Sequence, residues 1–208
     1  MSCENVINRA IAEINYREDP PNSNFTKYGE LYGVVGVPWC VIFLWWCFQE
    51  ANESKAFFGG KKTASCGQLY SWHKQSGQTV PRSEVKRGDI VILNFHGTTN
   101  TEHCGIVENV AGDKVVTIEG NTTISNQSED NGGIVARKTR HFAQIVGVIR
   151  PRYLPPDIPE NAWFADSVRY AIESGYMQGY TDGTFKPYQN INRAELAAIL
   201  ERLAKDAK

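Results

Sequence analysis

The chain has 208 residues, of which 41% are hydrophobic, and its formal net charge at pH 7 is −1. This length and composition suit one or two globular domains with a real core, and the balanced charge gives no electrostatic reason to expect a nucleic-acid partner. The five cysteines have no CxxC pair and no regular spacing, which argues against a disulfide framework and against a four-cysteine zinc site. We therefore expect a chain that is made in a reducing compartment.

The N-terminal residues, from Met1 to Val6, show no basic stretch followed by an apolar one, so we expect no secretory signal. No uninterrupted apolar run in the sequence reaches the length that a bilayer span requires. If the protein acts outside the cytoplasm, something else must release it.

Three segments in the first 76 residues predict helices, because their apolar residues recur at three- and four-residue steps or form a dense run. They cover about residues 5–17, 40–53 and 65–76. The polar segment 18–24 lacks the alternating Asp pattern of a calcium loop, so we expect a solvated loop there. His73 lies on the third segment, where we expect a partly exposed helix histidine.

Cys40 lies at or next to the start of the second predicted helix, two residues after Pro38. The free backbone N–H groups and the positive dipole end of a helix stabilise a thiolate there, and the thiolate is the nucleophilic form of cysteine. Cys40 is therefore a candidate nucleophile; the alternative is one more small buried hydrophobe. Cys47, two turns further along the same face, is expected to point into the core and to stay unreactive.

After Pro81 the pattern changes to short runs that are rich in β-branched residues and bounded by glycine or turn residues. Five such runs predict strands at 88–95, 104–110, 114–119, 133–137 and 145–150. The turn 111–113 joins the second and third runs as a hairpin. The first domain is thus predicted to be α+β, with helices first and an antiparallel sheet afterwards.

His103 stands at the start of the second predicted strand, and Glu119 stands at the end of the third. The start of one strand in an antiparallel hairpin lies opposite the end of its partner, so we expect these side chains to be neighbours. A carboxylate that accepts the Nδ1 proton would fix the tautomer, and the free nitrogen could take the proton of Cys40. The alternative for His103 is a hydrogen-bonded histidine at a sheet edge.

Four short motifs stand in order within residues 3–152. They are Pro38-Trp39-Cys40, Arg87-Gly88-Asp89-Ile90-Val91, His103-Cys104-Gly105-Ile106-Val107 and Glu119-Gly120-Asn121. Together they resemble a CHAP domain, the cysteine, histidine-dependent amidohydrolase/peptidase. The resemblance implies a papain-like α+β fold that cleaves peptidoglycan, either at the amide between muramic acid and the stem peptide or within the peptides.

The same resemblance implies a role for each matching residue. Cys40 would be the nucleophile and His103 the base, while Glu119 would orient the base and Asn121 would assist as a nearby polar residue. We expect no metal among the site residues and no cofactor. Some CHAP domains bind calcium near the N-terminal loop. The motif for this is not evident here, and whether this chain binds calcium stays an open question.

Residues 151–159 contain four prolines, which favours an extended, semi-rigid linker. We therefore place a catalytic domain at 1–150, the linker at 151–159 and a small module at 160–208. The module is predicted to be helix, glycine-rich loop, helix, and the sequence from Asn192 to Glu195 predicts a capping box at the second helix.

The motifs of this tail are Phe164-Ala165-Asp166, Gly175-Tyr176, the run 179–187 and Arg193-Ala194-Glu195. They resemble one S-layer homology (SLH) repeat, a module that binds secondary cell-wall polysaccharides of Gram-positive bacteria. By this resemblance Arg193 would pair with an acidic sugar substituent. The loop residues Asp182 and Gly183 would help, and Trp163 would form an aromatic wall. Asn192 replaces the usual Thr but can still cap a helix.

SLH repeats usually come in threes, and this chain has one, so we hold a homotrimer as a hypothesis. The alternative is a helical hairpin that packs against the first domain. The layout as a whole is that of a bacteriophage or prophage endolysin, made in the host cytoplasm and passed through the membrane by a holin.

We expect a peptidoglycan hydrolase whose partners are peptidoglycan and a secondary wall polysaccharide, with no nucleic acid and no membrane insertion. The amidase reaction is preferred over the endopeptidase reaction. The competing hypothesis is a wall-binding protein whose CHAP-like domain is inactive.

Overall fold

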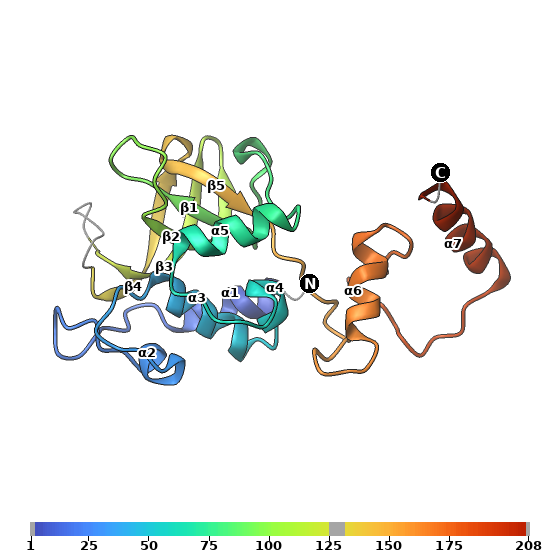
Figure 1. The fold of residues 1–208 in the computed structure, drawn as a ribbon, viewed down its shortest axis with the longest axis horizontal. Coiled ribbons are helices and arrows are strands. Elements are labelled where there is room, and N and C mark those ends of the chain that lie inside the picture. The colour runs from blue at the N-terminus through green and yellow to red at the C-terminus, as the bar shows by residue number, and fades with distance from the viewer. Residues whose placement is uncertain (1–2, 125–131, 207–208) are drawn as a thin grey trace. The chain divides into compact units, whose positions relative to one another are not determined.

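The computed structural model of the chain describes residues 3–124 and 132–206 (Figure 1). Two compact units emerge, of which the larger spans Cys3–Pro151 and the smaller begins at Arg152. The outermost residues of the two predicted domains, 1–2 and 207–208, lie outside the described residues.

The larger unit begins with helices, as predicted. They are α1 (Cys3–Ala12), α2 (Lys27–Tyr32), α3 (Cys40–Glu50), α4 (Ser54–Phe58) and α5 (Cys66–Gln75). The first predicted helix was too long, because the chain turns after Ala12 and Asn15 adopts a left-handed φ of 78°. The short helices α2 and α4 were missed, since five or six residues are too few to show a helical period.

A five-stranded sheet follows the helices. Its strands are β1 (Ile90–Leu93), β2 (His103–Ala111), β3 (Lys114–Thr122), β4 (Ile134–His141) and β5 (Ile145–Ile149). Their order in the sheet is β4-β3-β2-β1-β5, and all neighbouring strands are antiparallel. Two short 3-10 helices, Arg82–Glu84 and Phe142–Gln144, precede β1 and β5. The α+β prediction is confirmed.

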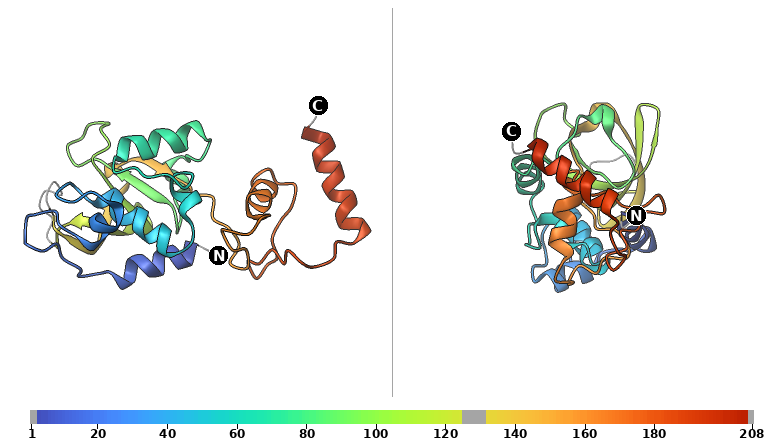
Figure 2. Two further views of the ribbon diagram at one scale, coloured as in Figure 1. Left: turned by 60° about the horizontal axis from the view of Figure 1, so that its bottom comes forward. Right: turned by 90° about the vertical axis from the view of Figure 1, so that its right-hand side faces the viewer.

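The helix α3 forms the centre of this unit. Its residues Val41–Leu44 are fully buried, and it contacts β2 and β3 on one side and α1 and α2 on the other (Figures 1 and 2). The approach to β3 is close at Gly120, where a Cβ atom would lie 2.5 Å from the Phe43 Cβ and 2.8 Å from the Trp39 ring. The N-terminus of α3 is thereby held against the end of β3.

His73 is fully buried, so the prediction of a partly exposed histidine was wrong. Its Nε2 lies 2.6 Å from the Phe57 carbonyl oxygen, and its Nδ1 lies 2.8 Å from Gln78 Oε1. Both ring nitrogens therefore have local partners that join α5 to the neighbouring chain. This histidine therefore has a structural role.

The smaller unit contains α6 (Ala165–Glu173) and α7 (Arg193–Asp206). A small apolar cluster lies under α6, formed by Leu154, Ile158, Ala165 and Val168. The predicted capping box is confirmed, because Asn192 Oδ1 accepts from the backbone N–H groups of Ala194 and Glu195 at 2.9 Å. The Glu195 carboxylate in turn accepts from the Asn192 N–H at 2.9 Å.

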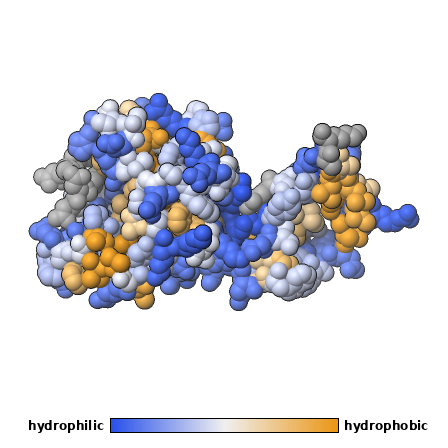
Figure 3. Space-filling view, viewed as in Figure 1, coloured by the Kyte–Doolittle hydropathy of each residue, from blue (hydrophilic) through white to orange (hydrophobic). Residues whose placement is uncertain are grey.

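One stripe of α7 is apolar and exposed, and Figure 3 shows it as a hydrophobic patch over that helix. Leu196, Leu200 and Leu203 form it, and each keeps more than two fifths of its surface exposed. Among the residues that the structure describes, no helix combines the length and the apolar character needed to cross a membrane.

Candidate active site

Cys40 is the first residue of α3, as predicted, and only 6% of its surface is exposed. The first N–H groups of a helix have no partners within the helix. Because Cys40 begins α3, these free N–H groups lie in the same turn as its thiol. The preceding residue, Trp39, is buried, and its indole N–H donates to Glu18 Oε2 at 3.2 Å. This anchor fixes the chain where α3 begins.

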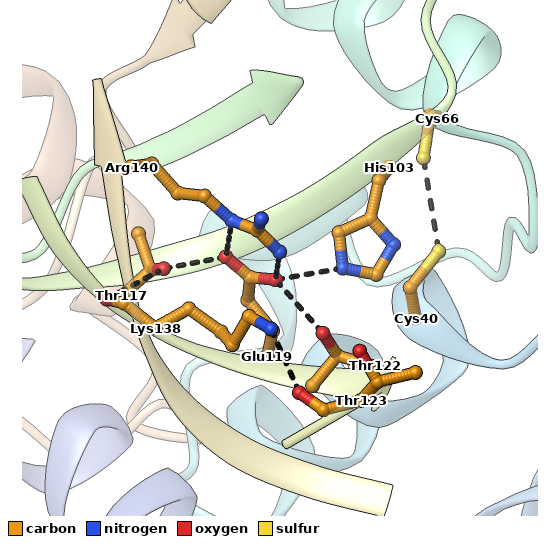
Figure 4. Close-up of polar contacts among 9 residues, drawn as sticks. All are labelled: Cys40, Cys66, His103, Thr117, Glu119, Thr122, Thr123, Lys138 and Arg140. Carbon is orange, nitrogen blue, oxygen red and sulfur yellow. Dashed lines mark hydrogen bonds and ion pairs between the residues drawn. The ribbon is translucent and has the colours of Figure 1, made fainter. Parts of the chain in front are cut away.

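The hairpin β2–β3 brings His103 and Glu119 together, as the antiparallel register predicts. His103 Nε2 lies 3.0 Å from Glu119 Oε2, and both side chains are buried (Figure 4). The other ring nitrogen points towards Cys40 (Figure 4). The prediction that Nδ1 would face the carboxylate was therefore wrong: strand register sets which residues meet, but the χ2 rotation of the imidazole decides which nitrogen does.

Glu119 is surrounded by hydrogen-bond donors. Arg140 Nε donates to Oε1 at 2.9 Å, and Arg140 Nη2 donates to Oε2 at 2.5 Å. Thr117 Oγ1 donates to Oε1 at 2.5 Å, and Thr122 Oγ1 lies 3.4 Å from Oε2 (Figure 4). With His103 added, both carboxylate oxygens have more than one partner, which is what a buried charge requires.

Arg140 was not among the predicted site residues. The prediction ended β4 at residue 137, whereas the strand continues to His141 and pairs Arg140 with Val115 of β3. Its guanidinium also stacks on Phe95, 4.7 Å from the ring centroid. Residues 137–141 are all polar, so the sequence does not show that buried and exposed positions alternate there. The end of β4 and the burial of Arg140 could therefore not be predicted.

These contacts set the charge of the three groups. Burial would raise the pKa of Glu119, but the hydrogen bonds from Arg140 and His103 outweigh it and lower that pKa to about 2. Burial would lower the pKa of His103, but its bonds to Cys40 and Glu119 raise it to about 10. Contacts with Cys104, Cys66 and His103 hold the pKa of Cys40 well below its ordinary range. Both shifts favour the charged pair, a Cys40 thiolate beside a His103 imidazolium.

Two further cysteines lie beside Cys40, and neither was a predicted site residue. Cys66 is the first residue of α5, and its Sγ lies 3.9 Å from Cys40 Sγ (Figure 4). Cys104 follows His103 on β2, and the three sulfurs all lie within 4.8 Å of one another. Cys47 is buried in the core further along α3, as predicted, and burial raises the pKa of its thiol.

Asn121 lies in β3 just beyond Gly120, at a left-handed φ of 55°. It is 2% exposed, and its Oδ1 is buried without a hydrogen-bond partner among the described residues. Its place at the end of β3 puts it near the site, but its amide makes no hydrogen bond with the His103 imidazole in the described structure.

The four predicted ligand-binding residues of the smaller unit do not share one pocket. Trp163 is 91% exposed, and Arg193 is exposed at the start of α7. Asp182 Oδ1 accepts from the Thr184 N–H at 2.9 Å, and Gly183 has a left-handed φ of 86°, so both shape the loop. A hollow of about 270 Å³ opens between this loop and α7. Glu195, Ile199 and Arg202 line it, and none of the four predicted residues does so in the described structure.

Comparison with known families accounts for both units. Residues 32–121 match the family model of the CHAP domain, and residues 156–197 match that of the S-layer homology domain. The chain contains a CHAP domain followed by an SLH domain. Both predicted resemblances are confirmed.

Curated relatives are similar to the SLH part. Cell surface glycoprotein 1 of Acetivibrio thermocellus is 46% identical over 44 residues, which is 21% of this chain and 2% of that protein. The S-layer protein of Bacillus licheniformis is 34% identical over 69 residues (31% of this chain, 8% of the relative). The S-layer protein sap of Bacillus anthracis is 33% identical over 79 residues (34% and 10%). The chain thus spans a tenth or less of these relatives.

Among solved structures, the chain is similar to the crystal structure of Ly7917, at 18% identity and a TM-score of 0.42. A second structure of Ly7917, with the hydrolyzing product of MDP, has a TM-score of 0.45. Each match covers 72% of this chain and 62% of the other.

Proposed function

We propose that the chain cleaves an amide bond of peptidoglycan by acyl transfer, with Cys40 as the nucleophile. His103 carries the proton, and Glu119 orients and charges His103. One observation carries the proposal: a nearly buried thiol at a helix start faces an imidazole whose other nitrogen lies 3.0 Å from a buried carboxylate. This is the arrangement that activates a cysteine nucleophile.

In the first step, the Cys40 thiolate attacks the carbonyl carbon of the amide. The oxygen becomes negative, and the unpaired N–H groups in the first turn of α3 would donate hydrogen bonds to it. The C–N bond then breaks as the His103 imidazolium gives its proton to the departing amine. An acyl thioester on Cys40 and a neutral imidazole remain.

In the second step, His103 takes a proton from water, and the resulting hydroxide attacks the thioester carbonyl. The carbon–sulfur bond breaks, and Cys40 leaves as a thiolate beside the restored imidazolium. Glu119 stays ionised throughout because its low pKa keeps it so, and it stabilises the positive charge on His103 in each resting state.

We favour the N-acetylmuramoyl-L-alanine amidase reaction and keep the endopeptidase reaction as its alternative, because the same thiol chemistry serves both. The SLH domain would hold the enzyme at a Gram-positive wall, with Arg193 towards an acidic substituent of the secondary polysaccharide. We further propose a phage or prophage endolysin that is made in the host cytoplasm and released by a holin. Five free cysteines in the described structure fit synthesis in a reducing compartment.

The decisive experiment digests purified Gram-positive peptidoglycan with the wild type, with Cys40→Ala and with the matched control Cys47→Ala. Mass spectrometry of the fragments separates the reactions. Glycan strands freed of stem peptides establish the amidase, and stems cut while still joined to glycan establish the endopeptidase. If no fragment depends on Cys40, the hydrolase proposal fails and a wall-binding protein remains.

The wall-binding part is tested with the inactive Cys40→Ala chain, so that binding is not followed by digestion. It should sediment with walls that carry the secondary polysaccharide and stay in solution with walls stripped of it. Adding Arg193→Ala should weaken the binding. Sedimentation analysis of the purified Cys40→Ala chain, without walls, tests the homotrimer hypothesis. A purely monomeric mass at micromolar concentration would contradict it.

A further inference from the structure

Cys66 and Cys104 form no bond with the substrate in the proposed acyl transfer, although their sulfurs lie beside that of Cys40. The three sulfurs come from the starts of α3 and α5 and from the beginning of β2, and all lie within 4.8 Å of one another. Thiolates grouped around one point are the preferred ligands of a soft or borderline metal ion. We propose that Cys40, Cys66 and Cys104 form a binding site for a divalent ion such as Zn²⁺ or Cd²⁺.

The spacing of the sulfurs suits such an ion. A zinc–sulfur bond of about 2.3 Å with tetrahedral angles puts two thiolate sulfurs about 3.8 Å apart. Cys40 Sγ and Cys66 Sγ lie 3.9 Å apart. A disulfide requires a separation of about 2.05 Å, and all five cysteines are free. Cys40 and Cys66 are therefore already placed as two ligands of a metal site, with Cys104 as the third.

The helix starts at this point favour negative sulfur, whereas burial raises the pKa of the Cys104 thiol. Cys40 and Cys66 are the first residues of helices of 11 and 10 residues, so two positive helix ends meet at the cluster. An ion can reach the site because Cys40 and Cys66 are 6% and 7% exposed, whereas Cys104 is fully buried behind them. Three protein ligands leave a fourth position for water, as in zinc sites that stay open.

The sequence hides this site because its ligands stand on three separate elements and form no CxxC pair. Cys40 is also the proposed nucleophile, so an ion bound to it occupies the electron pair that would attack the substrate. Metal binding should therefore stop hydrolysis reversibly. This consequence rests on the proposed function, whereas the binding of the ion does not.

The site is tested by titrating the full, reduced chain with Cd²⁺ and recording the sulfur-to-cadmium charge-transfer absorption in the ultraviolet. We expect the band to saturate at one ion per chain. Cys66→Ser and Cys104→Ser should each lower the band by about one third, because one of three thiolates is lost. Each should weaken affinity at least about tenfold, since even the loss of a residue that only supports a ligand costs that much.

The matched control is Cys47→Ser, which removes an equally buried thiol further along α3 and should leave the titration unchanged. A band that Cys66→Ser and Cys104→Ser do not change would overturn the proposal. X-ray absorption of the Zn²⁺-loaded wild type covers the case in which a variant fails to fold. It should show three sulfur neighbours at about 2.3 Å, and a shell of nitrogen and oxygen alone would also overturn the site.

The effect on activity is measured separately, as the Zn²⁺ concentration that halves the rate of wall digestion. For Cys66→Ser and Cys104→Ser this concentration should rise at least tenfold when each variant is compared with its own metal-free rate. A chelator should restore the wild-type rate. If the wild type digests no wall at all, the proposed function fails, but the Cd²⁺ titration still decides whether the metal site exists.

Discussion

Arg140 and Glu119 form a buried two-point ion pair, in which Nε donates to Oε1 at 2.9 Å and Nη2 donates to Oε2 at 2.5 Å. Glu119 has no exposed surface, and Arg140 is nearly buried. Without a cation, burial would raise the pKa of this carboxyl group and favour its neutral form. Arg140 is therefore a positioning residue: it keeps Glu119 charged, and Glu119 keeps His103 charged.

Replacing Arg140 with Met should lower kcat/KM about a hundredfold, the loss typical of a misplaced catalytic group. It should also move the high-pH limb of the kcat/KM profile down from pH about 10, because a neutral Glu119 no longer raises the pKa of His103. Arg140→Lys keeps the charge but cannot make the two-point contact. Its kcat/KM and the position of its high-pH limb should therefore lie between those of Arg140→Met and the wild type.

Arg137→Met is the matched control for this prediction. Arg137 lies on the same strand and also pairs with a carboxylate, Glu108, at 2.6 Å, but on the surface. Its replacement should leave the pH profile in place. If Arg140→Met lowers the rate without moving the high-pH limb, Arg140 supports the fold but does not set the charge of Glu119.

The second prediction concerns the thiols beside Cys40. The contact with Cys104 is the largest cause of the low pKa of Cys40, so Cys104→Ala should raise that pKa. The rate of Cys40 alkylation by iodoacetamide, followed against pH, reports its thiolate fraction. The midpoint of this curve should move to higher pH in Cys104→Ala and stay in place in Cys47→Ala. Equal midpoints in all three proteins would mean that the neighbouring sulfur does not stabilise the thiolate.

The strands and the pairing of His103 with Glu119 could be predicted because both rest on local information. β-branched runs mark strands, and the tight turn between β2 and β3 fixes which ends of the two strands meet. The position of Cys40 followed from Pro38 and the apolar run behind it. In each case a few neighbouring residues determine the result.

The other parts of the site depend on contacts between distant segments. Arg140 is buried because β4 continues past its apolar part, and from there the arginine side chain reaches Glu119 on the neighbouring strand β3. Cys66 and Cys104 meet Cys40 through the packing of α5 and β2 around α3. A single sequence contains no local signal for any of these contacts, since a buried arginine and an exposed one look the same.

The charge of Glu119 should make the stability of the larger unit depend on acid pH. Its pKa is lowered from an ordinary 4.5 to about 2, so the ionised group stabilises the folded state above pH 4.5, and this stability is lost as the pH falls from 4.5 to 2. The shift corresponds to a free energy on the order of 3 kcal/mol. The free energy of unfolding of the wild type should therefore exceed that of Glu119→Gln by several kcal/mol at pH 7. This difference should shrink below pH 4.5.

Urea unfolding at pH 7, 4.5 and 3 measures this difference. Glu108→Gln is the control, because Glu108 pairs with the half-exposed Arg137, and such surface pairs contribute less than about 1 kcal/mol. A difference between wild type and Glu119→Gln that stays constant from pH 7 to pH 3 would show that the ionisation of Glu119 does not stabilise the fold.

The close approach of Gly120 to α3 gives the last prediction. A Cβ atom there would lie 2.5 Å from the Phe43 Cβ, which is fixed to the helix backbone and cannot rotate away. Gly120→Ala must therefore move α3 away from β3, at a cost of about 1–3 kcal/mol in unfolding free energy. Because Cys40 begins this helix while His103 and Glu119 lie on the sheet, the same shift should lower kcat/KM about a hundredfold.

Gly112→Ala separates this clash from the general effect of adding a methyl group to the β2–β3 hairpin. Gly112 has a φ of +62° and no atom within 4 Å of an added Cβ, so its replacement strains the turn but pushes nothing aside. It should cost about 1–2 kcal/mol of stability and leave kcat/KM close to that of the wild type. If Gly120→Ala is as active as Gly112→Ala, the geometry between Cys40 and His103 tolerates a shift of α3, and close contact at Gly120 serves packing alone.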